Sequence, residues 1–460
     1  MTMLEKVKGR SIGIIGMARS GVAVARLIKS RGGIPLVSDL KAADKLVHEI
    51  NELKTFDIQF ETGGHSERLL RSDFIIPSPG VPNDSEIMKK VTDMGIPLFS
   101  EIEVASWFCR GRIIAVTGSN GKTTTTSLIG AILETAGRNH VVCGNIGRAF
   151  SAAVDEVPED GYAVVEVSSF QLEYIMDFKP HIALILNITP DHLDRYENFN
   201  AYKEAKYRIT ENQAPEDFLV INADDQVCSQ DDLKTDARII RFSIIREMPV
   251  GVFKRGETLI GIVDKKEYDI IRTKDIRIPG PHNLQNAAAA SLAALLLGIE
   301  PEVMAETLRQ FPGVEHRLEE VAILAGIRFV NDSKATNVDA VCYALKSFDS
   351  PICLIAGGRD KGGDFEPMIE CGRKNIKEII LLGEARHKMF EAMGKIFPTQ
   401  FAESMDDAVR KAFAAASPGE VVLLSPACAS FDMYENYEHR GRDFKRAVMA
   451  LRGMERVRRD

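Results

Sequence analysis

The stretch from residue 113 to residue 126 reads Ile-Ile-Ala-Val-Thr-Gly-Ser-Asn-Gly-Lys-Thr-Thr-Thr-Thr. Its first four residues predict a buried strand, and a helical pattern follows the glycine-containing turn. Apolar runs at 12–15 and 351–356 also pass into glycines. Buried strands that alternate with helices are typical of parallel sheets, so the sequence predicts the α/β fold class.

The turn in this stretch has the composition of a phosphate-binding loop. The backbone N–H groups of such a turn and the start of the following helix attract phosphate oxygens. Lys122 is then placed to reach the β- and γ-phosphates of a nucleotide, and the Thr123 hydroxyl to hold Mg²⁺. The residues expected to contact the nucleotide here are Gly118, Ser119, Asn120, Gly121, Lys122, Thr123 and Thr124.

The spacing of this loop departs from the common nucleotide-binding pattern. The pattern G-x-x-x-x-G-K-[ST] would place its first glycine at position 116, where this chain has Val116. A polar turn that contains Gly-Lys-Thr by chance is therefore the alternative interpretation. The order of strand, turn, lysine, hydroxyls and helix favours the phosphate loop.

Composition excludes several classes of function. The formal charge of −8, from 66 acidic and 58 basic residues, does not provide the basic stripe that nucleic-acid binding needs. Seven scattered cysteines without a C-x-x-C pair argue against a zinc site or a disulfide framework and favour a reducing compartment.

The chain also lacks the features of a membrane or secreted protein. Residues 1–10 have no apolar signal-peptide core, and the apolar run 287–297 is shorter than the ~20 residues of a membrane span. We therefore expect a soluble, cytoplasmic protein without a membrane partner.

Chain length and breaks predict the domain organisation. A chain of 460 residues favours about three domains. Proline- and glycine-containing breaks at 78–82, 94–97 and 311–313 predict boundaries near residues 102 and 313. Residues 228–278 alternate Ile, Val and Arg, which predicts a meander of short strands inserted in the middle domain.

The shortened loop Thr117-Gly-Ser-Asn-Gly-Lys-Thr-Thr resembles the nucleotide loop of the Mur ligase and folylpolyglutamate synthase superfamily. The resemblance covers nearly the whole chain. Within the superfamily, Asn331-Asp-Ser-Lys-Ala-Thr-Asn337, Ser425-Pro-Ala-Cys-Ala-Ser-Phe-Asp432 and His439-Arg-Gly441 are similar to the D-glutamate-adding branch.

The resemblance implies three domains with separate tasks. Residues 1–102 would form a Rossmann-like domain that binds a UDP-sugar, and 103–313 a P-loop ATPase-like central domain. Residues 314–460 would form a Rossmann-like domain that carries the incoming amino acid. The chain is expected to act as a monomer.

The resemblance also assigns a site for two Mg²⁺ ions. Glu166 follows an apolar run, and a buried carboxylate is costly unless it is paired or binds a metal. The resemblance makes Glu166 the bridge between the metals, although a salt bridge to a lysine is the alternative. It places His192 at the second metal, where a plain loop or cap histidine is the alternative. It implies a carbamylated Lys206 at the same metal, against a solvated helix face that Lys206 would share with Lys203.

Further substrate and nucleotide contacts come from the resemblance. Asn283 and Asn286 would lie near the adenine and Arg317 near the phosphates, and Asp332 would also bind the nucleotide. Helix capping is the alternative for Asn283, and turn chemistry is the alternative for Asn145. The residues assigned to substrate are Ser20, Asp39, Asn145, Ser168, Lys334, Ser430 and Tyr437. The resemblance implies that Ser20 and Asp39 lie in the UDP site and that Lys334, Ser430 and Tyr437 lie in the D-glutamate site. The loop 16–21 lacks the G-x-G-x-x-G spacing of a dinucleotide site.

The implied reaction is the ATP-dependent addition of D-glutamate to UDP-N-acetylmuramoyl-L-alanine through an acyl phosphate, a step of peptidoglycan precursor synthesis. Lys122, Glu166, His192 and Lys206 would be catalytic. The base that deprotonates the amine stays open between His192 and an adjacent carboxylate. The alternatives are a folate polyglutamate ligase, a ligase that adds a diamino acid, a non-catalytic P-loop switch and an oxidoreductase.

Overall fold

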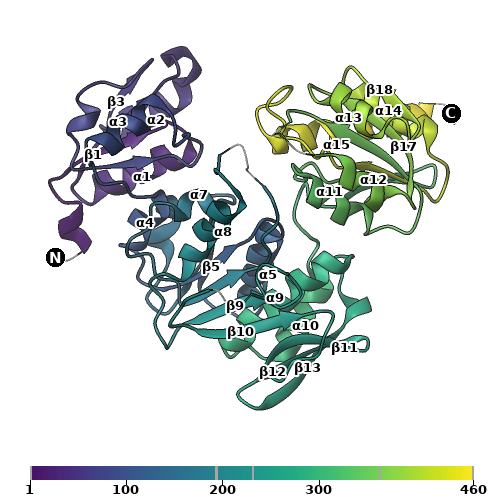
Figure 1. Cartoon of the computed structure of the whole chain (residues 1–460), viewed down its shortest axis with the longest axis horizontal. Helices are drawn as coiled ribbons and strands as arrows, with labels where there is room; N and C mark the ends of the chain where they lie inside the picture. The colour runs from purple at the N-terminus through teal and green to yellow at the C-terminus, as the bar shows by residue number, and fades with distance from the viewer. Residues whose placement is uncertain (1–2, 192–194, 231–232, 361, 363, 458–460) are drawn as a thin grey trace. The chain divides into compact units, whose positions relative to one another are not determined.

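The computed structural model describes residues 3–191, 195–230, 233–360, 362 and 364–457. The described chain contains three sheets, and they can be followed with their helices in Figure 1. Two compact units are distinguished: one holds 1–190, 195–275 and 285–309, and the other consists chiefly of 310–460. The α/β fold class is confirmed. The boundary proposed at 102 lies inside a helix, and that at 313 lies between a helix and a strand.

The first sheet is parallel, with strand order β3-β2-β1-β4. Its elements are β1 (Ser11–Ile15), α1 (Arg19–Ser30), β2 (Ile34–Asp39), α2 (Val47–Thr55), β3 (Gln59–Thr62), β4 (Phe74–Pro77) and α3 (Glu86–Asp93). The glycine loop between β1 and α1 is tightly packed, because a Cβ at Gly21 would lie 2.0 Å from the Gly16 carbonyl oxygen. Backbone packing therefore requires glycine at position 21.

The second sheet has the order β13-β12-β11-β10-β9-β8-β5-β7-β6. Its strands are β5 (Arg112–Thr117), β6 (His140–Gly144), β7 (Tyr162–Glu166), β8 (Ile182–Ile185), β9 (Phe218–Asn222), β10 (Arg238–Ser243), β11 (Gly251–Arg255), β12 (Thr258–Val263) and β13 (Lys266–Arg272). Pairing is parallel from β6 to β11 and antiparallel from β11 to β13. The meander predicted within 228–278 is confirmed for β11 to β13, which extend this sheet, whereas β10 pairs in parallel with both of its neighbours.

The helices that follow in this part of the chain are α4 (Glu101–Ser106), α5 (Lys122–Thr135), α6 (Phe150–Ala153), α7 (Ser169–Leu172), α8 (Phe199–Tyr207), α9 (Pro281–Leu296) and α10 (Pro301–Gln310). The apolar run that begins at residue 287 lies in α9. Its alanines at 287–290 are fully buried, so the run serves packing. Among the described helices, none is both long and apolar enough to cross a membrane.

A buried carboxylate on α4 organises the chain before β8. Glu103 is fully buried, and its oxygens accept hydrogen bonds from the backbone N–H groups of Met176, Asp177 and Phe178 at 2.8–3.0 Å. They also accept one from the Trp107 ring nitrogen at 2.8 Å. Because every buried polar group needs a partner, these bonds offset the cost of burying the charge.

The third sheet has the order β14-β15-β19-β16-β17-β18 and is parallel except for β14. Its strands are β14 (Glu319–Leu324), β15 (Ile327–Asn331), β16 (Ile352–Gly357), β17 (Ile376–Leu382), β18 (Thr399–Phe401) and β19 (Val421–Leu424). Its helices are α11 (Val338–Leu345), α12 (Glu366–Gly372), α13 (Arg386–Met393), α14 (Met405–Ala415) and α15 (Tyr437–Val457). Since β15, β19 and β16 are neighbours, the loops at their carboxyl ends share one edge, where α/β folds bind ligands.

Candidate active site

The phosphate loop between β5 and α5 has the backbone that its glycines allow. Gly118 and Gly121 have φ angles of 152° and 84°, a region that side chains rarely adopt. The Lys122 ammonium folds back over the loop and donates to the carbonyl oxygens of Gly118 at 2.8 Å and Ser119 at 2.9 Å. A glycine turn that opens a long helix beside a lysine fits the phosphates of a nucleotide.

A residue that the sequence analysis missed, Asn187, holds this loop. Its side-chain oxygen accepts from the Asn120 N–H at 2.7 Å, and its side-chain nitrogen donates to the Asn120 carbonyl at 3.0 Å. Its own carbonyl accepts from the Ser119 N–H at 2.9 Å. In the sequence, Asn187 stands out as a polar residue that follows the apolar run of β8, the strand that pairs with β5.

Asn286 lies against the same loop, and its contact with the adenine stays a prediction. Its side-chain oxygen accepts from the Thr125 hydroxyl at 3.2 Å, and a Cβ at Gly121 would lie 2.4 Å from that oxygen. Position 121 must therefore be glycine for packing as well as for its φ. Asn283 instead donates to the Pro279 carbonyl at 2.7 Å, which stabilises the start of α9.

Glu166 and Asn145 meet at the ends of two paired strands. Gly144, the last residue of β6, is in register with Glu166, the last residue of β7. The Asn145 amide donates to Glu166 Oε1 at 2.9 Å, and the Asn145 N–H donates to the Glu166 carbonyl at 2.9 Å. The buried carboxylate is thereby fixed at the carboxyl edge of the sheet, where it fits a metal ligand.

Lys206 is buried in α8 and points at the phosphate loop. Only 1% of the residue is exposed, and its ammonium donates to the Gly118 carbonyl at 2.9 Å. The ammonium also lies 4.7 Å from the centre of the Tyr202 ring. The alternative of a solvated helix face is wrong for Lys206. His192 falls outside the described residues, so its assigned role stays a prediction.

Two predicted substrate residues have local structural partners. Ser168 is the N-cap of α7: its hydroxyl accepts from the Gln171 N–H, while the Gln171 side chain accepts from the Ser168 N–H at 3.0 Å. Asp39 accepts from the N–H groups of Met17 at 2.7 Å and Lys41 at 2.8 Å, which fixes the glycine loop after β1. Ser20 lies in the first turn of α1 and is half-buried. Substrate contact remains a prediction for all three.

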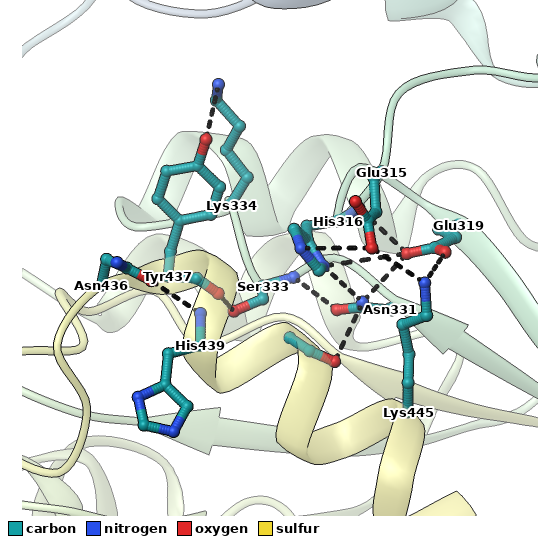
Figure 2. A network of polar contacts seen from close by, with 11 residues as sticks. Glu315, His316, Glu319, Asn331, Ser333, Lys334, Asn436, Tyr437, His439 and Lys445 are labelled. Atoms are coloured by element: carbon teal, nitrogen blue, oxygen red, sulfur yellow. Dashed lines mark hydrogen bonds and ion pairs between the residues drawn. The ribbon is translucent and has the colours of Figure 1, made fainter. Parts of the chain in front are cut away.

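The residues predicted to bind the incoming amino acid lie together at the carboxyl edge of the third sheet. Lys334 follows β15, and its ammonium donates to the Tyr437 hydroxyl at 3.3 Å while lying 5.1 Å from the centre of the ring (Figure 2). Ser430 follows β19 and is 2% exposed. The two loops touch directly, because the Ala427 N–H donates to the Ala335 carbonyl at 3.0 Å.

Asp332 and Arg317 are two oppositely charged residues that lie near each other at this edge of the sheet. Burial raises the pKa of the Asp332 carboxyl to about 6, and the nearby Arg317 opposes that shift. The carboxyl accepts from the Ser425 hydroxyl at 2.9 Å and from the Leu318 N–H at 3.3 Å. His316 and Leu318, on either side of Arg317, have φ angles of 64° and 45°. Such strain in non-glycine residues is typical of functional segments.

Glu315, His316 and Glu319 lie close enough to resemble a metal site, with ligand atoms within 4.8 Å of one another. The Lys445 ammonium already neutralises both carboxylates, at 3.0 Å from Glu315 and 2.6 Å from Glu319 (Figure 2). The Asn331 amide donates to His316 Nδ1 at 2.9 Å. The cluster therefore fixes the strained segment around Arg317.

We predict that Asp332→Asn stabilises the chain near neutral pH while it lowers activity. Because the folded-state pKa is above the ordinary 3.8, ionisation costs stability, and this cost grows from about pH 4 to about pH 6. The variant should gain about 1–3 kcal/mol in the free energy of unfolding at about pH 7.5 and less at about pH 5. Urea unfolding at both pH values measures this difference. An equal gain at both would contradict the titration.

Comparison with known proteins agrees with this arrangement. Residues 11–87 match the MurD N-terminal domain, 116–294 the Mur ligase middle domain, and 316–428 the Mur ligase, glutamate ligase domain. Among solved structures, MurF from Acinetobacter baumannii has a TM-score of 0.62 at 18% identity, with 90% of each chain covered. The pseudomurein peptide ligase type C from Methanothermus fervidus has a TM-score of 0.59 at 20% identity, with 96% of this chain and 100% of its own covered. These two structures share the fold.

Two sequence relatives are similar over almost their full length. The UDP-N-acetylmuramoylalanine–D-glutamate ligase of Thermoanaerobacter sp. (strain X514) is 42% identical over 452 residues, which cover 97% of this chain and 100% of the relative. That of Acidobacterium capsulatum is 43% identical over 451 residues, which cover 97% and 98%. The chain therefore belongs to the Mur ligase family of ATP-dependent, amide-bond-forming ligases.

Proposed function

We propose that this chain adds D-glutamate to UDP-N-acetylmuramoyl-L-alanine in the cytoplasm, with hydrolysis of ATP to ADP and phosphate, as a step of peptidoglycan precursor synthesis. The observation that carries the proposal is the phosphate loop between β5 and α5, with the Lys122 ammonium over the carbonyl oxygens of Gly118 and Ser119. A glycine loop that opens a helix and carries a lysine ammonium attracts the phosphates of a nucleotide. The full-length similarity to D-glutamate ligases supports the choice of substrates.

The proposed reaction has two steps. The alanyl carboxylate oxygen attacks the γ-phosphorus of ATP, the bond to the bridging oxygen breaks, and ADP leaves. The D-glutamate amine then attacks the carbonyl carbon of the acyl phosphate, phosphate leaves, and the amine proton passes to a base. A carboxylate is a poor electrophile, so phosphorylation supplies the leaving group that amide formation needs.

The chain contributes positioning and charge neutralisation. Lys122 is held over the phosphate loop, where it would stabilise the negative charge of the transferred phosphoryl group. Glu166 is held by Asn145 and would bind Mg²⁺, together with Thr123 and, as the family resemblance implies, His192 and a carbamylated Lys206. Bound Mg²⁺ would neutralise the phosphate oxygens.

The decisive experiment is an assay of ADP release with UDP-N-acetylmuramoyl-L-alanine as acceptor. D-glutamate should support turnover, while L-glutamate, L-lysine and meso-diaminopimelate should not. Turnover with meso-diaminopimelate alone would assign the chain to the diamino-acid-adding ligases. ATP hydrolysis that depends on neither substrate would favour a P-loop switch instead.

Lys334 is predicted to select D-glutamate, because an ammonium can bind the second carboxylate of the substrate by a charge-assisted hydrogen bond. Lys334→Ala should raise the KM for D-glutamate about tenfold to a hundredfold, the loss of one charged hydrogen bond, with a much smaller effect on the KM for the sugar nucleotide. Lys346→Ala, an exposed lysine of the same unit, is the control. Equal effects on both substrates would count against the assignment.

Lys206 is predicted to carry a carbamate that ligates Mg²⁺, because Mg²⁺ prefers oxygen ligands and an ordinary ammonium would be repelled. Lys206→Ala should lose turnover about a hundredfold or more, and small carboxylates such as formate or acetate should restore part of it. Lys203→Ala, on the same helix, is the control. Mass spectrometry of the intact chain that finds only the unmodified amine, or a fully active Lys206→Ala, would refute the carbamate.

A further inference from the structure

The guanidinium of Arg440, on the first turn of α15, joins the two loops that carry Lys334 and Ser430. On the first loop, Nε donates to the Ser333 hydroxyl at 3.0 Å and Nη2 to the Ser333 carbonyl at 2.8 Å. On the second loop, Nη1 donates to the carbonyls of Cys428 at 3.1 Å and Ala429 at 3.4 Å. The Arg440 guanidinium therefore bonds Ser333, which directly precedes Lys334, and Ala429, which directly precedes Ser430.

Burying the charge of Arg440 costs free energy that its hydrogen bonds to neutral groups do not fully offset. Arg440 is 2% exposed, and burial lowers its pKa to about 10 although the nearby Asp432 and Asp332 carboxylates oppose that shift. The acceptors of its four hydrogen bonds are three carbonyls and one hydroxyl, all neutral. Burying a charge on neutral acceptors is unfavourable compared with an apolar side chain of similar size. The planar fork of an arginine, however, offers a fixed geometry that no apolar side chain provides.

The neighbouring strands and loops restrict how far the two loops that Arg440 joins can move apart. The loops leave β15 and β19, which are neighbouring parallel strands. A third loop, after β16, fills the remaining side, because a Cβ at Gly358 would lie 2.2 Å from the Ala429 carbonyl and 3.1 Å from Arg440 Nη1. The Ser333 hydroxyl also donates to the Tyr437 carbonyl at 2.8 Å, which ties the first loop to the start of α15 (Figure 2).

We propose that Arg440 is a positioning residue, which holds the loops that carry Lys334 and Ser430 in one fixed arrangement for the incoming D-glutamate. The proposal rests on the function proposed above, because it assumes that both residues bind the incoming amino acid. Arg440 itself touches neither substrate. Its bonds to the backbone on both sides hold the two contacts at one separation, so the amino acid binds without first ordering the loops.

The test compares Arg440→Lys and Arg440→Ala with the wild-type enzyme. Lysine keeps the charge but cannot donate in three directions from one plane. Both variants should raise the KM for the amino acid about tenfold to a hundredfold, the loss of charged hydrogen bonds, and change the KM for the sugar nucleotide less than about twofold. Arg442→Ala, an exposed arginine of the same helix, should resemble the wild type.

Chemical rescue separates positioning from general stability. Millimolar guanidinium should lower the KM for the amino acid in Arg440→Ala, because it can fill the vacated space and bond both loops. Methylammonium at the same ionic strength should not. Equal increases in both KM values, or a loss confined to kcat with a lower melting temperature and no rescue, would overturn the proposal. If Arg440→Ala does not fold, the split of KM values in Arg440→Lys decides by itself.

The ADP-release assay of the wild-type enzyme with different amino acids separates a failure of this proposal from a failure of the proposed function. If the wild-type enzyme uses another amino acid, the D-glutamate assignment fails, and the Arg440 variants are then assayed with the amino acid that is used. A KM split for that amino acid would retain the positioning role. If D-glutamate is used and the split is absent, only the role of Arg440 is wrong.

Discussion

Lys122→Ala is expected to lower the rate of ATP-dependent ligation about a thousandfold or more, while the chain stays folded. The Lys122 ammonium lies over the phosphate loop on the carbonyls of Gly118 and Ser119. In the proposed reaction it faces the negative charge that moves between ADP and the acyl phosphate. Preorganised charge of this kind contributes about 3–4 kcal/mol to the stabilisation of a transition state.

The measurement is ADP release under saturating substrates, together with the circular dichroism spectrum and the melting temperature. Lys266→Ala, an exposed lysine on β13 of the same sheet, is the matched control and should keep the wild-type rate. Because the phosphate loop is also bonded by Asn187, it should keep its shape without the lysine. A Lys122→Ala variant with near-normal turnover would refute the assigned role.

Glu166→Gln is the second change with a large expected effect, a loss of about a hundredfold to a thousandfold in turnover. Glutamine keeps the size of the side chain and the oxygen that accepts from Asn145, so the fold around the ends of β6 and β7 should persist. What it removes is the negative charge, which the binding of Mg²⁺ requires. The apparent affinity for Mg²⁺, measured from the activity at increasing concentrations of the ion, should fall with the rate.

Glu101→Gln provides the control for Glu166→Gln. Glu101 is a buried carboxylate on α4 that accepts from the Ser151 N–H, and burial raises its pKa. Its neutralisation should leave turnover and the response to Mg²⁺ unchanged. If both variants lose activity to the same extent, the effect of Glu166→Gln would reflect a buried charge in general and the metal role would be wrong.

The fold class and the phosphate loop could be predicted from the sequence because both depend on short spacings. A strand, a glycine turn and a helix are local in the chain, and residues 113–126 contain all three. The pairing of Asn145 with Glu166 was not visible in this way. It requires β6 and β7 to lie side by side in register, and the hydrogen bond joins side chains 21 residues apart.

Short sequence patterns do not decide whether a polar side chain caps a helix, faces solvent or faces a binding site. The family resemblance assigns Ser168 to substrate, and its hydroxyl is the cap of α7 in the folded chain. Lys203 and Lys206 are three residues apart on one helix, yet only the latter is buried at the phosphate loop. A helical period gives the angle between two side chains, and it does not say which of them faces a neighbouring element.

The amino-acid sequence was sufficient for the α/β fold class, for the strand, turn and helix of residues 113–126 and for the family. The tertiary structure alone decided how distant segments meet. Arg440 bonds Ser333 across 107 positions of the chain, and Lys445 bonds Glu315 across 130. Local conformation follows from steric preferences and hydrophobic period over a few residues. Contacts of this length follow from which strands become neighbours in the sheet and which helix packs beside them, and the whole chain must fold before those neighbours exist.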